Sequence, residues 1–215
     1  MKNIYGFAVL VIIFFCCLSA PLMAGNIYSF SLSSSLGIIY GHSEELVYKY
    51  AGKDTLLSEL IWDLKPLVYS GAALDFGRTN PWERWGFFAG ASIKYGLPLK
   101  TGVMEDRDWM AAKGGYLTHY SRHDAYSNGA LLSDLSLGFS FSFFEALLLK
   151  PGIRFSYMYF SWSAQDGFTQ HTSNSGGDYP PWDSGITKSP VSGSGILYSQ
   201  HWFVLAPALA AELKL

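Results

Sequence analysis

The stretch Asp134-Leu135-Ser136-Leu137-Gly138-Phe139-Ser140-Phe141-Ser142-Phe143 places an apolar side chain at every second position. Such alternation predicts a β-strand with two different faces, because successive side chains of a strand point to opposite sides. One face here consists of leucine and phenylalanine, and the other consists of small or polar residues. The stretch therefore predicts a strand that separates an apolar environment from an aqueous one.

Five further runs alternate in the same way, near residues 30–40, 60–76, 87–99, 153–159 and 197–215. Period 2 sustained this long predicts strands of roughly twenty residues, well above the usual ~5–6. In the second run, Leu60, Trp62, Leu64, Leu74 and Phe76 share one parity, so one continuous face is expected for them.

The connections between these runs alternate in length: long near residues 51, 115 and 175, short near 80 and 145. Outer-membrane barrels combine short periplasmic turns with long external loops in this manner. We therefore predict an all-β fold, an antiparallel transmembrane β-barrel in the outer membrane with about six long strands. Six is fewer than the eight or more of single-chain bacterial barrels, so the barrel is expected to be incomplete. The alternative is a secreted β-sandwich, which would have shorter strands and a polar outer face.

The N-terminus has the form of an export signal. Lys2 precedes an apolar run over residues 4–18, and small residues follow up to Ala24. We predict a signal peptide over residues 1–24 and an outer-membrane barrel domain over 25–215. An uncleaved membrane anchor is the alternative reading.

Composition excludes several classes of protein. Both cysteines, Cys16 and Cys17, lie in the predicted leader, so neither a disulfide nor a cysteine nucleophile is expected in the exported domain. The net charge of −2 is nearly balanced, which argues against a nucleic-acid partner. The sequence has no phosphate-binding glycine loop, no His-x-x-x-His spacing and no Gly-x-Ser-x-Gly elbow, so we expect no cofactor and no metal.

The chemistry is expected in Met104-Glu105-Asp106-Arg107-Asp108-Trp109-Met110, at the end of the third alternating run. Asp106 and Asp108 are two residues apart, so a strand directs both carboxylates to one face. Two carboxylates this close do not both ionise freely, and one can then act as an acid. Ser121 and His123 follow in an expected polar loop. The alternative is that both acids are solvated carboxylates at a loop edge.

These motifs resemble the omptin family of outer-membrane endoproteases. The resemblance rests on Asp106 to Met110 and on Ser121-Arg122-His123, supported by Trp62, Phe160-Ser161-Trp162-Ser163-Ala164 and Tyr198-Ser199-Gln200 in the same order. It implies a vase-shaped, ten-stranded barrel that cleaves peptides at basic residues by means of an activated water. It further implies that Asp106 and Asp108 are the catalytic acid pair, and that His123 and Ser121 are an accessory pair. The implied partners are outer-membrane lipid and a peptide or protein substrate with basic residues.

The family pattern also contains an Asp–His base on the opposite wall, which has no counterpart in the six runs. We expect His42 and His119 at the surface near the mouth, His171 in a long loop over about residues 165–192, and His201 facing lipid or an aromatic girdle. Two hypotheses follow: an omptin-like, aspartic-type endopeptidase, or a non-enzymatic barrel acting as an adhesin, a structural protein or one piece of a split gene. Self-association or a second chain could close the barrel.

Overall fold

The computed structural model describes residues 28–49, 55–78, 85–111, 115–143, 147–174, 176 and 178–213. The predicted signal peptide and the connections near 80 and 145 lie outside these ranges. Within them, no helix is long and apolar enough to cross a membrane. The strands are β1 (Tyr28–Tyr48), β2 (Leu56–Arg78), β3 (Trp85–Gly96), β4 (Lys100–Asp108), β5 (His119–Phe143), β6 (Leu147–His171), β7 (Ser189–Pro190) and β8 (Ser194–Leu213).

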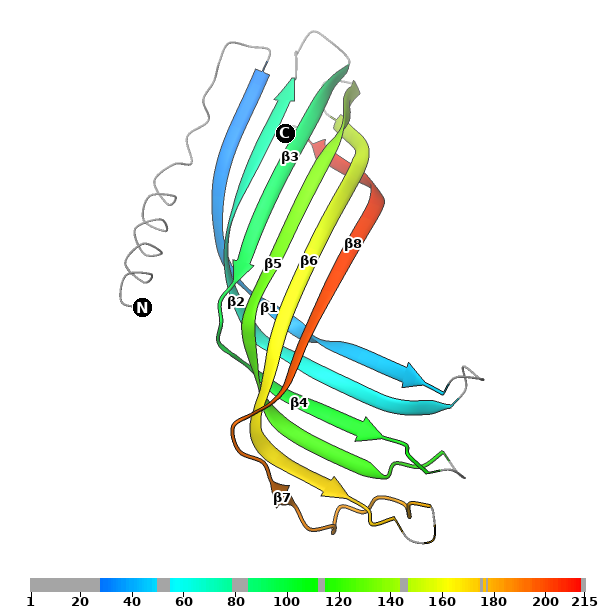
Figure 1. The fold of residues 1–215 in the computed structure, drawn as a ribbon. Coiled ribbons are helices and arrows are strands. Elements are labelled where there is room, and N and C mark those ends of the chain that lie inside the picture. Colours follow the sequence, from blue (N-terminus) through cyan, green and yellow to red (C-terminus); the bar gives the residue numbers. More distant parts are fainter. Residues whose placement is uncertain are drawn as a thin grey trace, which may run out of the picture.

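All strands belong to one antiparallel sheet, which confirms the predicted all-β class. The order is β1-β2-β3-β5-β6-β8, with β4 between β2 and β5 and the short β7 beside the end of β6. No pairing joins β1 to β8 in the described residues, so the sheet is an open, curved wall. In Figure 1 this wall bends about halfway along its strands, and the ends that carry β4 and β7 extend to one side.

The six long crossings match the six predicted runs, but their boundaries differ in three places. The third run is two strands, because residues 97–99 interrupt it between β3 and β4. Ser121 and His123 lie inside β5 rather than in a loop, and β6 continues to His171, beyond the expected start of the loop near 165. β5 and β6 each have 25 residues. At about 3.3 Å per residue they span roughly 80 Å. Each is far longer than the 9–11 residues of a strand that cross a bilayer.

The apolar positions of the membrane-spanning half point outward. Large exposed side chains of this kind include Leu36, Ile38, Leu74, Phe76, Ile93, Leu135, Leu137, Phe139, Ile153, Leu205, Leu209 and Leu213. The other face is polar: Arg154 pairs with Asp134 at 2.7 Å, and Ser92 donates a hydrogen bond to the same carboxylate. Apolar exposure on one face and ion pairing on the other fit a wall between lipid and water.

An aromatic girdle marks the end of the lipid-facing surface on the side of β4 and β7. His201 contacts the rings of Tyr157 and Tyr159, and Tyr157 also contacts Phe203. Such amphipathic rings gather at the level of the lipid headgroups. The prediction for His201 agrees with this position. The strand segments beyond it therefore extend outside the membrane.

The sheet changes faces at bulges just beyond this girdle. On β2, Lys65 and Pro66 together lie opposite Tyr40 of β1, and β5 has a register shift between Ser127 and Gly129. One extra residue in a strand moves every following side chain to the opposite face of the sheet. The expected continuous face from Leu60 to Phe76 is therefore wrong, because its first half turns inward.

Just beyond the girdle, the inward-facing residues Trp62, Trp162 and Tyr198 form a core, here called the waist core. Trp62 stacks on Trp162 with ring centroids 6.0 Å apart and on Tyr198 at 5.5 Å. Side chains from β2, β6 and β8 can meet only across the concave side of the wall. Ser43 of β1 also donates a 2.5 Å hydrogen bond to Gln200 of β8. At the waist, the first and last long strands thus approach each other through their side chains.

Candidate active site

Asp106 and Asp108 lie on the concave face of β4, beyond the waist. Met104, two residues earlier, is buried in the same core cluster as Trp62, so the alternation of the strand directs both acids to that side. Ser58 of β2 lies opposite Asp108, and its hydroxyl donates a 3.3 Å hydrogen bond to a carboxylate oxygen of Asp106. The two carboxylates therefore share one face and lean on β2.

The environment of Asp106 favours its protonated form. Burial, reinforced by the negative charge of Asp108, raises the pKa of Asp106 from 3.8 to about 6. The hydrogen bond from Ser58 and the nearby His123 oppose this rise without cancelling it. Asp106 thus holds a proton more readily than a solvated carboxylate, which is the condition for an acid catalyst near neutral pH.

Ser121 and His123 stand beside the acid pair on β5. Ser121 lies opposite Asp106 and His123 opposite Met104, and both side chains are buried. The Nδ1 of His123 is 2.5 Å from the backbone carbonyl oxygen of Asp166. A carbonyl only accepts, so Nδ1 of His123 donates the hydrogen of this bond. The structure therefore brings together all four residues singled out in the sequence.

A bulge on β6 presents that carbonyl. Asp166 and Gly167 have positive φ values of 52° and 106°, and they lie where β5 and β6 shift register. A Cβ at Gly167 would come within 2.1 Å of the carbonyl oxygen of Arg122. Only glycine fits there without displacing the backbone. The bulge reverses the parity of β6 again, so Thr169 and His171 face the concave side.

A second group, here named the rim cluster, consists of Asp108, His119, His171 and Tyr179. The register places Asp108 opposite His119 and His119 opposite His171. The two imidazole centroids are 4.7 Å apart, and Tyr179 contacts His119 at 4.9 Å. The expectation for His171 is wrong, because it is the last residue of β6 rather than part of a loop; His119, expected at the surface near the mouth, is half-buried there. Alternation does not reveal them, because one bulge on each strand separates them from its apolar run: the Ser127–Gly129 shift on β5 and the Asp166-Gly167 step on β6.

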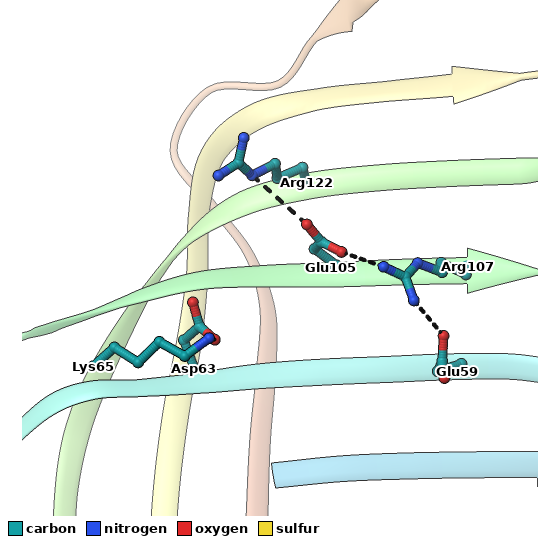
Figure 2. A network of polar contacts seen from close by, with 6 residues as sticks. All are labelled: Glu59, Asp63, Lys65, Glu105, Arg107 and Arg122. Atoms are coloured by element: carbon teal, nitrogen blue, oxygen red, sulfur yellow. Dashed lines mark hydrogen bonds and ion pairs between the residues drawn. The ribbon is translucent and has the colours of Figure 1, made fainter. Parts of the chain in front are cut away.

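The opposite face of the same strands carries an ionic ladder, shown in Figure 2. Arg107, between the two acids in sequence, points away from them and pairs with Glu59 at 2.7 Å and Glu105 at 2.6 Å. Arg122 of β5 lies 3.9 Å from Glu105. The ladder joins β2, β4 and β5 behind the acid pair. It thus supports the strand that carries Asp106 and Asp108.

The donor set fits hydrolysis by an activated water. Within the described ranges, no group of three or more His, Cys, Asp or Glu side chains is arranged to hold a metal ion. The concave face instead offers a carboxyl with a raised pKa, a second carboxylate and the imidazole rings of His119, His123 and His171. These are the components of general acid–base catalysis.

Comparisons with known proteins agree with this architecture. The model of the omptin family matches residues 26–215. Among solved structures, the outer membrane protease OmpT from Escherichia coli is similar, with a TM-score of 0.71 and 20% sequence identity over 90% of this chain and 61% of that chain. This likeness shows a shared fold, and the chain spans about three fifths of the length of that protease. A search of curated proteins gives no match.

Proposed function

Because the chain belongs to the omptin family and is an outer-membrane protein, we propose that it is an endopeptidase that cleaves peptide bonds near basic residues at the outer mouth of the wall. The observation that carries this proposal is the convergence of Asp106, Asp108, Ser121 and His123 on one concave face. The two acids, Asp106 and Asp108, on the same face also attract cationic peptide segments to it.

Each residue has a role that its surroundings support. Asp108 is half-buried and orients the attacking water through its carboxylate. Asp106, with its raised pKa, donates a proton to the departing amine. His123, fixed by the carbonyl of Asp166, presents Nε2 to the acid pair, and Ser121 lies directly opposite Asp106. The latter two residues position the acids and the water.

The test uses the full-length protein, refolded in detergent with outer-membrane lipid, and peptides that contain paired basic residues. Cleavage is expected, with a loss of at least about 100-fold in Asp106→Ala and Asp108→Ala, the usual scale for a general acid or base. The matched control is Asp124→Asn, which alters an acid paired with Lys100 on the other face of β5. Activity that survives in both aspartate variants would remove this mechanism.

A non-enzymatic barrel is the second candidate. The waist favours it, since Ser43 of β1 and Gln200 of β8 meet there across the concave side. A concave face filled at this level by Trp62, Trp162 and Tyr198 suits an adhesin or a structural role. Absence of peptide cleavage in every detergent and lipid tested would favour this candidate.

Among the described residues, the outer edges of β1 and β8 pair with no other strand. Unpaired backbone groups in lipid cost several kcal/mol each. We therefore propose that self-association or a second chain pairs with these edges in the membrane. Cross-linking of the protein in lipid vesicles tests this, and an uncross-linked monomer at all protein-to-lipid ratios would contradict it.

A further inference from the structure

The rim cluster contains two imidazoles that the roles above leave unused. Three neighbouring strands align Asp108, His119 and His171 in one row across the concave face. His119 is half-buried and contacts the rings of His171 and Tyr179, whereas His171 is exposed. The row therefore leads from the acid pair to solvent.

The hydrogen bonds of Thr118 fix the proton of His119. The Thr118 hydroxyl donates its one hydrogen to the backbone carbonyl of Asp108 at 2.9 Å. The same oxygen lies 2.8 Å from Nδ1 of His119 and can then only accept from it. Nδ1 of His119 therefore carries the hydrogen, and Nε2 has the free lone pair.

We propose that His119 is the general base of the hydrolysis, on the same wall as Asp106 and Asp108. The inference rests on the proposed peptidase function and names the group that accepts the proton. The attacking water lies between the Asp108 carboxylate and Nε2 of His119. No facing wall is then needed for the base, because the strand pairing already sets it beside the acids.

The proton balance closes within these residues. The water oxygen bonds to the carbonyl carbon, and its proton passes to Nε2 of His119. The C–N bond then breaks, and the departing amine takes the proton of Asp106. His119 returns its proton to Asp106, directly or through solvent at His171, so that both groups regain their starting forms.

The neighbours of His119 favour the neutral ring that a base requires. Burial lowers the pKa of His119, His171 on β6 lowers it further, and Asp108 on β4 opposes both. The remaining polar groups in contact are the Thr118 hydroxyl and the Tyr179 ring. Removal of His171 should therefore raise the pKa of His119. Because only the neutral ring accepts a proton, the acidic limb of the activity profile should move to higher pH.

The experiment measures kcat/KM against pH for the full-length wild type, His119→Gln, His171→Gln and His201→Gln on a peptide with paired basic residues. The kcat/KM of His119→Gln is expected to fall about 10²–10⁴-fold, and its residual activity should lack the acidic limb. His171→Gln should keep the alkaline limb of the profile, which follows the ionisation of Asp106, and should shift the acidic limb to higher pH. His201→Gln, on the lipid face, should match the wild type. The chain has five histidines, so NMR titration of their ring protons in the same variants assigns the limb to His119.

The outcomes separate the two proposals. An inactive wild type overturns the peptidase function itself. A wild type that cleaves, together with a His119→Gln variant of equal kcat/KM or an unchanged acidic limb, overturns only the assignment of the base. A folded His119→Gln variant whose loss is uniform at all pH values does the same, since a structural role would produce that pattern.

Discussion

Asp106→Asn should make the protein more stable at high pH while leaving it nearly unchanged at low pH. The pKa of Asp106 is raised from 3.8 to about 6 by burial and by Asp108. The folded state therefore binds the proton more tightly than the unfolded state does. As the pH rises from about 4 to about 7, the wild type loses stability, because a half-buried carboxylate must ionise in the folded protein. Asparagine does not titrate and still offers an oxygen to the Ser58 hydroxyl.

The size of the effect follows from the shift. Each tenfold change in proton affinity is worth about 1.4 kcal/mol, so a rise from 3.8 to about 6 corresponds to at most about 3 kcal/mol. Solvent screening at a half-buried site reduces this to roughly 1–2 kcal/mol. The free energy of unfolding of Asp106→Asn relative to wild type should therefore increase by that amount between pH 4 and pH 8.

The assay is urea unfolding of the refolded protein in detergent micelles, followed by tryptophan fluorescence, which reports on Trp62 and Trp162 in the waist core. Asp124→Asn, on the opposite face, is the control and should show no such gain. Parallel curves for Asp106→Asn and wild type from pH 4 to pH 8 would refute the argument, because they would mean that Asp106 is solvated. Asp108→Asn removes a like charge beside Asp106 and should therefore lower the pKa of Asp106. The pH range over which stability is lost should then move to lower pH.

Three other substitutions test the scaffold by the same unfolding assay. Gly167→Ala should cost at least about 2 kcal/mol, since its Cβ would strike the carbonyl of Arg122 at a φ of +106°; Gly115→Ala, in open space, should be neutral, and equal effects would contradict the account of the bulge. Trp62→Ala should cost about 3–5 kcal/mol, because the side chain is fully buried; a cost below about 1 kcal/mol would mean that the waist is loosely packed. Arg107→Gln should cost less than about 1 kcal/mol, and the cost should shrink in about 1 M salt; a loss that is independent of salt would exclude an electrostatic origin.

Much of the membrane-spanning half could be predicted because its signal is local. Leu135, Leu137 and Phe139 alternate with small residues, and the structure exposes all three on the outer face. Asp106 and Asp108 share a face for the same reason, since two positions along a strand restore the direction of the side chain. These predictions needed no knowledge of neighbouring strands.

The face changes were missed because a bulge is a relation between two strands. Trp62 shares its parity with Phe76 in the sequence, yet the pairing of Lys65 and Pro66 with a single residue of β1 turns Trp62 inward. Pro66 was the available signal, since proline inside a strand marks an edge or a bulge. The Asp166-Gly167 step was a similar signal on β6.

The misplaced loop around Ser121 has a different cause. Outside the membrane both faces of the wall meet water, so apolar alternation no longer distinguishes a strand from a loop. The strand persists there because β4 and β6 supply hydrogen-bonding partners on both sides. Alternation nevertheless continues to sort the side chains, with Arg107 and Arg122 on the outer ladder and Asp106 and His119 on the concave face. In the membrane, alternation places apolar side chains toward lipid and polar ones toward water. Beyond the membrane, the same alternation places the ionic ladder on one face and the proposed catalytic residues on the other. For this reason a strand, rather than a loop, carries the proposed site.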